Sequence, residues 1–139
     1  MQEANINYIA VLVAAVVNMI IGALWYSPVL FGNLWVRLSG IDKKSIDKSK
    51  QKGMGKLYAA TFISTFVMAF VLAHFIDYTE STTVSDGMQA GFWIWIGFFA
   101  PVMLGMVLWE GKPWKLYLLN VSYYLINLFV MATILALWP

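Results

Sequence analysis

Four long apolar stretches dominate the pattern of hydrophobic and polar positions along the chain. They cover residues 6–26, 57–78, 87–109 and 116–138, and each is near the roughly 20 residues that an α-helix needs to cross a bilayer. The stretches lack the period-two alternation of strands and are rich in Leu, Ala and Met, so helices are the structure that satisfies their backbone groups in lipid. The pattern predicts an all-α, polytopic membrane protein with four transmembrane helices.

The end of the first stretch carries two further signals. Trp25 and Tyr26 arrive at the depth where amphipathic aromatic rings sit among lipid headgroups, so they either anchor the helix there or line a site. Ser27 and Pro28 then end or bend the helix. Beyond them, apolar side chains recur at spacings of three and four, which predicts a short amphipathic helix over about 28–39 that lies in the membrane interface.

Composition agrees with this assignment and narrows the function. Of the 139 residues, 61% are hydrophobic and 12% are charged, which excludes an ordinary soluble domain, and we expect one membrane domain over residues 1–139. The chain has no cysteine and one histidine, which excludes a disulfide framework, a thiolate nucleophile and a histidine cluster for a metal. The sequence also lacks a Gly-rich phosphate loop and a Ser/His/Asp set, so we expect neither an enzyme nor a bound metal or cofactor.

The basic residues set the expected orientation. All nine Lys and Arg residues lie between the first and second helices or between the third and fourth. The positive-inside rule therefore predicts that these two connections face the cytoplasm and that both termini lie outside. Most of the lysines belong to a loop over about 40–56, where we expect contact with anionic lipid headgroups without specificity. A loop this short does not indicate nucleic-acid binding.

Polar side chains inside the predicted helices form the candidate site. Asn18 lies near the middle of the first helix, and Asn120, Tyr124 and Asn127 share one face of the fourth. An amide in hydrocarbon costs a few kcal/mol unless it is paired, so these groups should face protein or water. Two interpretations stay open. The amides either make interhelical hydrogen bonds that fix helix register, worth about 0.6 kcal/mol each, or they line a polar pocket or solute path.

Two ionisable residues join the candidate set. Glu110 ends the third helix, where the helix dipole disfavours a carboxylate, so we expect a cationic partner among Lys112, Lys115 and Arg37. Its functional interpretation is an acidic site at a cytoplasmic vestibule. His74 lies about one turn from the outer end of the second helix, where it is either a hydrogen-bonding group at headgroup level or a proton-sensitive gate.

Small residues recur at every fourth position in three of the predicted helices. Such stripes let helices approach closely, and the proline in the third helix removes one backbone hydrogen bond and can kink it. The stripes are Ala10, Ala14, Asn18 and Gly22 in the first helix, Thr61, Thr65, Ala69 and Ala73 in the second, and Gly97, Pro101 and Gly105 in the third.

The segment from Asn18 to Trp35 reads NMIIGALWYSPVLFGNLW. Together with four helices, the Trp109–Glu110 pair and Asn120 early in the fourth helix, this segment resembles the pattern of a family of small bacterial membrane proteins, domain of unknown function 1761, over nearly the whole chain. The resemblance implies a four-helix fold and a location in the bacterial inner membrane. It brings no established function.

Two classes of function fit these residues. The first is a small transporter or channel subunit, in which an oligomer places Asn18, Tyr124, Asn127 and Glu110 around a solute path. The second is a lipid- or partner-binding accessory or scaffold protein that uses the same asparagines for assembly. We expect membrane lipids and further copies of this chain as partners in both classes. Because no charge lies at mid-depth, the first class favours neutral or weakly hydrated solutes.

Overall fold

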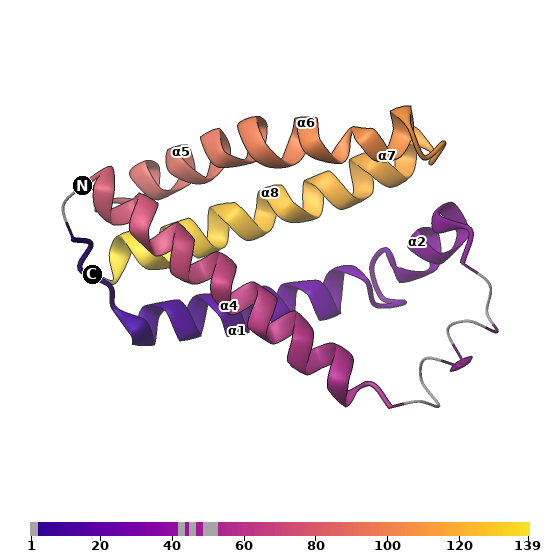
Figure 1. The fold of residues 1–139 in the computed structure, drawn as a ribbon, viewed down its shortest axis with the longest axis horizontal. Coiled ribbons are helices and arrows are strands. Elements are labelled where there is room, and N and C mark those ends of the chain that lie inside the picture. The colour runs from indigo at the N-terminus through magenta and orange to yellow at the C-terminus, as the bar shows by residue number, and fades with distance from the viewer. Residues whose placement is uncertain (1–2, 42–43, 45–46, 49–52) are drawn as a thin grey trace.

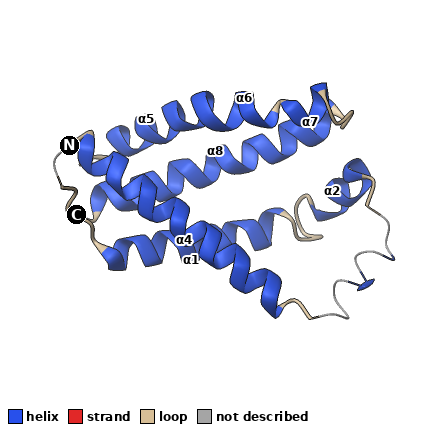
Figure 2. Ribbon diagram, in the orientation of Figure 1, coloured by secondary structure: helices blue, strands red, loops and turns tan. Residues whose placement is uncertain are grey.

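The computed structural model describes residues 3–41, 44, 47–48 and 53–139, and every regular element among them is a helix (Figures 1 and 2). Four helical spans are long and apolar enough to cross a membrane, so the predicted fold class is confirmed and the chain is a membrane protein. The elements are α1 (Tyr8–Trp25), the short α2 (Gly32–Ser39), α4 (Gly55–Tyr78), a third span made of α5 (Val84–Ile94), a π-helix (Trp95–Phe99), α6 (Ala100–Met103) and α7 (Gly105–Leu108), and finally α8 (Trp114–Leu137).

Local signals place the ends of the four long spans within three residues of their predicted positions. The side chain of Asn7 accepts hydrogen bonds from the backbone N–H groups of Ile9 and Ala10 and so caps α1. Thr83 and Asp86 form a capping box at the start of α5. Pro113, with its extended backbone, directly precedes α8, because a residue with fixed φ and no N–H cannot sit inside the helix.

Helix α8 lies at the centre of the bundle and contacts α1, α4 and α5, while α4 crosses over α1 (Figure 1). Both termini and the turn between α4 and α5 lie at one end, which we call the terminal end. The segments that follow α1 and α7 lie at the opposite end, the loop end. The helix arrangement is therefore antiparallel between sequential spans.

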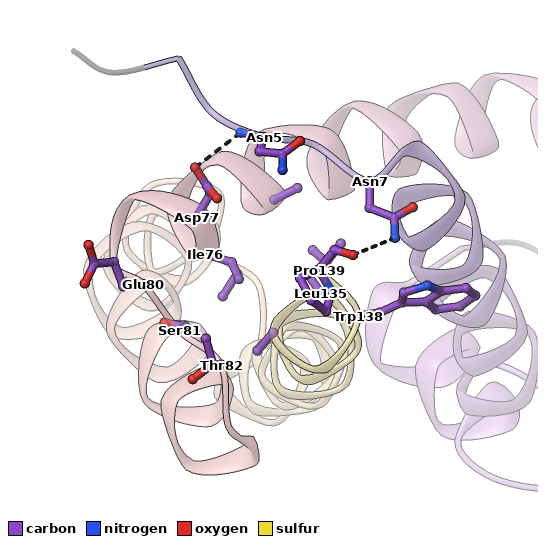
Figure 3. A pocket seen from close by; sticks show the side chains of 12 residues that line it. Asn5, Asn7, Ile76, Asp77, Glu80, Ser81, Thr82, Leu135, Trp138 and Pro139 are labelled. Atoms are coloured by element: carbon purple, nitrogen blue, oxygen red, sulfur yellow. Dashed lines mark hydrogen bonds between the residues drawn. The ribbon is translucent and has the colours of Figure 1, made fainter.

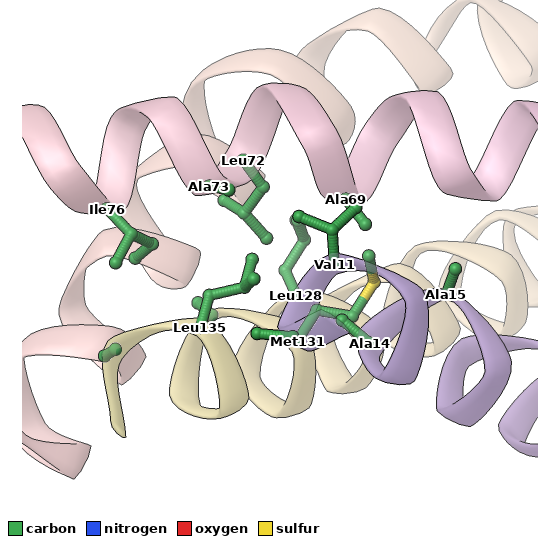
Figure 4. Packing of buried hydrophobic residues seen from close by; sticks show 13 residues of the cluster. Val11, Ala14, Ala15, Ala69, Leu72, Ala73, Ile76, Leu128, Met131 and Leu135 are labelled. Atoms are coloured by element: carbon green, nitrogen blue, oxygen red, sulfur yellow. The ribbon is translucent and has the colours of Figure 1, made fainter. Parts of the chain in front are cut away.

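The hydrophobic core fills the terminal half of the bundle. Ala14 of α1, Ala69 of α4 and Met131 of α8 are completely buried, and they meet where the three helices cross (Figure 4). Lipid tails are as apolar as these side chains, so the hydrophobic effect does not drive helices together in a membrane, and close van der Waals contact does. Alanine allows that contact because its small side chain lets the helix backbones approach.

The small-residue stripes predicted for α1 and α4 lie mostly in this core, but the stripe predicted for the third span is wrong. Gly97 faces open space and Pro101 is exposed. Gly87 and Gly91 of α5 make the close contact instead. A Cβ atom would lie 2.9 Å from the Ala132 carbonyl oxygen at Gly87, and 2.8 Å from the Leu128 carbonyl oxygen at Gly91. The small residues of the third span that touch α8 thus lie in α5, because the helices pack tightly only in the terminal half of the bundle.

The third span is interrupted near its middle. A π-helix over Trp95–Phe99 precedes Pro101, whose ring cannot donate a backbone hydrogen bond. Two side chains join this region to α8: the Trp95 indole donates to the Val121 carbonyl at 2.7 Å, and the Tyr117 hydroxyl donates to the Ala100 carbonyl at 2.7 Å. The interruption is therefore joined to α8 at two points just before the proline.

The turn after α1 explains why α2 begins at Gly32 rather than near residue 28. Ser27 closes the turn: its hydroxyl donates to the Leu24 carbonyl at 2.7 Å, and its own carbonyl accepts from the Gly32 N–H at 2.8 Å. A Cβ atom at Gly32 would lie 2.5 Å from the Tyr26 carbonyl oxygen, so this turn requires glycine. Helix α2 ends at Ser39 and is followed by Gly40, whose φ of 71° is left-handed.

A substitution pair tests the packing of α5 on α8. We expect Gly91→Ala to lower the free energy of unfolding by about 1–3 kcal/mol, because its methyl group must separate two backbones. The control Gly97→Ala adds the same methyl group in open space, and it should leave stability unchanged or raise it by up to about 1 kcal/mol. Thermal unfolding in mild detergent measures both. Equal losses for the two variants would contradict this packing.

Candidate functional site: a polar cavity at the loop end

The loop-end half of the bundle contains a cavity of about 1280 Å³. Most of its lining residues come from the segment after α1, from α2 and from the loop-end parts of α4, α6 and α8. Figure 1 shows that α1 and α4 diverge from α8 toward this end. Aromatic rings, amides and two residues of opposite charge share its surface. The lining residues are Tyr26, Pro28, Gly32, Asn33, Trp35, Val36, Arg37, Asp47, Met54, Thr61, Met103, Asn120 and Tyr124.

Tyr26 connects three elements at the cavity wall. Its hydroxyl donates a 2.8 Å hydrogen bond to the Asn120 side-chain oxygen on α8. Its ring packs edge-on against Trp35 of α2 and Tyr123 of α8, with centroids 5.8 and 5.1 Å apart. Burial, with a smaller effect of Tyr124 and Tyr123, raises the pKa of the Tyr26 hydroxyl well above its ordinary value. Tyr26 lies one residue beyond α1 and stays a neutral donor at physiological pH.

Trp25 also turns toward the protein. Its ring lies 4.7 Å from Phe31 and 6.1 Å from Tyr123, centroid to centroid. Its indole nitrogen is buried and has no hydrogen-bond partner among the described residues. Neither Trp25 nor Tyr26 is only a headgroup anchor, because both rings pack against Tyr123 of α8.

Asn18 lies deeper, on the far side of Tyr123 from the cavity. Asn18 is 4% exposed, and its side-chain oxygen is 3.4 Å from the Tyr123 hydroxyl, a long hydrogen bond between α1 and α8. The same hydroxyl would lie 2.6 Å from a Cβ atom at Gly22. Gly22 therefore makes the space through which Tyr123 reaches Asn18.

Asn127 is buried completely, and neither of its amide atoms has a hydrogen-bond partner in the described part of the chain. Tyr123 lies one helical turn before Asn127 on the same face of α8, but the described structure has no hydrogen bond between the two side chains. Buried polar groups are almost always paired. Of the three predicted asparagines, Asn120 makes a good interhelical bond, Asn18 a long one and Asn127 none.

The structure thus divides the predicted set on α1 and α8. Tyr26, Asn120 and Tyr124 line the cavity, and the Tyr124 ring packs against Phe99 of the third span, with centroids 5.1 Å apart. Asn18 and Asn127 lie inside the packed bundle and do not line it.

Glu110 lies apart from the cavity, and its predicted cationic partner is wrong. The residue is exposed two positions beyond α7 and has no ion pair with any described residue. Lys112 instead donates to the Ser39 carbonyl at 3.2 Å, at the end of α2. A carboxylate beyond the last helical turn and in contact with solvent feels little of the helix dipole, so it needs no partner.

His74 lies on α4 in the terminal half, far along the helix from the cavity residue Thr61. Its Nδ1 is 2.8 Å from the Phe70 carbonyl oxygen, so Nδ1 carries the proton, and its ring packs edge-on against Phe70 and Tyr78. These contacts describe a half-buried hydrogen-bonding residue. The proton-sensitive gate stays a prediction.

A second, smaller cavity of about 260 Å³ lies at the terminal end (Figure 3). The Asn5 backbone N–H donates to the Asp77 carboxylate at 3.3 Å, and the Asn7 amide donates to the Pro139 carbonyl at 3.2 Å, as the dashed lines show. Its polar groups thus bond to one another across the helix ends. The loop-end cavity, which is larger and lined by aromatic rings, is the stronger candidate site.

Sequence reasoning missed Tyr123, the residue that joins the cavity wall to the buried amides. Its ring contacts Trp25, Tyr26 and Tyr124. The signal was available, because a tyrosine four residues before Asn127 lies on the same helix face. The sequence placed the cavity residues Asn33, Trp35 and Arg37 on an interfacial helix and not at a site with Tyr124, because nothing in the sequence shows that α2 contacts α8.

The family described as "Protein of unknown function (DUF1761)" matches residues 9–136. The chain belongs to the DUF1761 family. The DUF1761 match covers all four spans except Tyr8 and Leu137, and every residue of the loop-end cavity. Comparison with curated proteins and with solved structures found no match.

Cysteine variants test whether water fills the cavity. The chain has no native cysteine, so each introduced thiol reports alone. We expect Thr61→Cys and Asn120→Cys to react with a charged, membrane-impermeant methanethiosulfonate, because both positions line the cavity and only a hydrated thiol ionises.

The matched controls are Ile63→Cys and Leu118→Cys. These side chains are 64% and 57% exposed on outward faces of α4 and α8, which contact lipid. Mass shifts after timed labelling in proteoliposomes measure the rates. Similar rates for cavity and lipid-facing thiols would contradict a water-filled cavity.

Proposed function

We propose that this DUF1761 protein is a small transporter or channel subunit that admits a small organic solute to the loop-end cavity. The observation that carries the proposal is the asymmetry of the bundle along its axis. One half is packed around completely buried alanines, and the other half encloses about 1280 Å³ lined by rings and amides. A membrane protein that is closed at one end and open at the other has the form expected of one state of a carrier.

The interrupted third span supports a change between two states. A π-helix directly before a proline is a place where a helix bends without losing its remaining hydrogen bonds. Here the interruption lies beside the cavity residue Met103. Bending at this point would change the width of the loop-end half while α5 stays packed on α8 through Gly87 and Gly91.

The cavity lining favours a solute with an apolar body and neutral hydrogen-bonding groups. Trp35 and Tyr124 offer ring faces, and Asn33 and Asn120 offer amides. Arg37 and Asp47 both line the cavity, and their opposite charges give no net preference for an anion or a cation. Sites of this type bind mostly through apolar contact and take their specificity from a few polar groups.

The orientation and the membrane follow from the basic residues. We propose that the loop end faces the cytoplasm of a bacterial inner membrane, because the basic residues cluster there. The lysines near this mouth would contact anionic lipids. Of the lysine-rich loop, Lys43, Lys50 and Lys52 lie outside the described residues.

Homo-oligomer formation is part of the proposal, since α4 and α5 carry many exposed large apolar side chains. The alternative function is a lipid- or partner-binding accessory protein, which the same exposed side chains favour. We propose no catalytic role, metal or cofactor for either function.

Single cysteines also test the orientation. We expect Lys56→Cys, at the loop end of α4, to react with an impermeant maleimide only after cells are permeabilised. Ser85→Cys, at the opposite end of the bundle, should react in intact spheroplasts. Both native side chains are exposed, so access to the reagent is the only difference. The reverse pattern would place the cavity on the outer side.

Native mass spectrometry from a mild detergent tests the solute site. We expect a homo-oligomer that carries a reproducible small molecule other than lipid. The adduct should disappear in Asn120→Leu, which removes the amide that pairs with Tyr26, and persist in Leu118→Ile on the lipid-facing side. Wild-type protein that carries only lipids of varied headgroup would contradict the proposal and favour the accessory function.

A further inference from the structure

Asn127 is the most completely buried polar residue among those described, and its amide lacks hydrogen bonds. Asn127 is 0% exposed, and both of its amide atoms lack a partner among the described residues. Its neighbours on α8, Leu128 and Met131, are core residues with 1% and 0% exposure. An unpaired amide in such surroundings weakens the fold, so its presence calls for a role outside the resting structure.

Asn127 and Asn18 lie at one depth. Asn127 is ten residues from Leu137, the end of α8, and Asn18 is ten residues from Tyr8, the start of the antiparallel α1. At a rise of 1.5 Å per residue, both lie about 15 Å from the terminal end, near the middle of a bilayer core about 30 Å thick. Tyr123 lies between them: its hydroxyl is 3.4 Å from Asn18, and it precedes Asn127 by one turn on the same face of α8.

This cluster of Asn18, Tyr123 and Asn127 adjoins the cavity. The Tyr123 ring packs against Tyr26 and Tyr124, both of which line the cavity, with centroids 5.1 Å apart in each pair. A movement of Tyr123 alone would therefore connect the cavity to the two amides.

The cluster contains no charged group, and its chemistry is that of carboxamides and a phenol. All charged residues of the four spans lie near the helix ends: Lys56, Asp77, Asp86 and Lys115. A charged ligand at this depth would lose its hydration without gaining a counter-charge. A neutral hydroxyl group can both donate to an amide oxygen and accept from an amide nitrogen.

A purely structural role does not account for Asn127. Asparagines that fix helix register do so through hydrogen bonds to a neighbouring helix. Asn120 makes such a bond with Tyr26 at 2.8 Å, whereas Asn127 makes none.

We infer that Asn127, with Asn18 and Tyr123, forms an inner site at the middle of the membrane through which a small neutral hydroxyl-bearing molecule, water or a polyol, passes from the cavity. This inference deepens the proposed transport function and rests on it. The amide is unpaired when the bundle is closed and is paired by the passing hydroxyl group.

Stopped-flow light scattering from proteoliposomes tests the inner site. The probes are an outward glycerol gradient, which reports polyol flux, and a sucrose gradient, which reports water flux alone. We expect wild-type protein to raise flux several-fold above empty liposomes. Asn127→Leu should return the flux to the empty-liposome level, and Asn127→Ser, which keeps a hydrogen-bonding group, should retain part of it.

The matched control is Ile126→Leu. It introduces leucine at the neighbouring position, where the side chain is partly exposed, and it should behave as wild type. Flux in the sucrose gradient alone identifies water as the molecule, and flux in the glycerol gradient, with or without water flux, identifies a polyol. Flux equal to that of empty liposomes, or unchanged by Asn127→Leu in a monodisperse sample, overturns the inference. A small-molecule adduct at the cavity that persists alongside absent flux would leave the proposed solute site standing and reject only the inner site.

Discussion

Close contact between α8 and the small residues of its neighbours determines the shape of the whole bundle. In lipid, helices associate where their backbones can approach, and here that occurs at Ala14, Ala69, Gly87 and Gly91, all in the terminal half. Toward the loop end, large rings take the place of these small residues at the end of α1 and on α8, namely Trp25, Tyr26, Tyr123 and Tyr124. The helices cannot stay as close around such rings. The cavity is therefore a consequence of a gradient in side-chain size along the bundle.

The polar residues divide along the same gradient. Where the rings hold the helices apart, Tyr26 and Asn120 pair at 2.8 Å across α1 and α8 and give the cavity wall a fixed geometry. Where the helices close, Asn127 has no partner in the described structure. Residues that weaken a fold without local compensation are concentrated at functional sites. The bundle thus combines a stabilising polar pair at the cavity with a destabilising amide at its inner end.

The sequence was sufficient for the fold and for part of the site. Helix spans followed from apolar run length, and the family resemblance carried by Asn18–Trp35 is confirmed. Asn18, Asn120, Tyr124 and Asn127 were recognisable because amides stand out in apolar helices. Which face of a helix packs against its neighbours was harder to predict. Gly91 and Gly97 both lie in the apolar third span, but only Gly91 contacts α8. The partner of Tyr26 could not be found either, because 94 residues separate it from Asn120.

The thermal stability of Asn127→Leu, measured beside Asn120→Leu in the same detergent, tests most directly whether the inner amide serves function rather than assembly. Leucine has the same branched arrangement of side-chain heavy atoms as asparagine, with bulkier ends, and needs no hydrogen bond. We predict that Asn127→Leu unfolds at the wild-type temperature or above it, because it removes an unpaired buried amide. Asn120→Leu should unfold at a lower temperature, because it leaves the Tyr26 hydroxyl without its acceptor. An equal loss of stability in both variants would show that Asn127 holds the helices together, and would contradict the account.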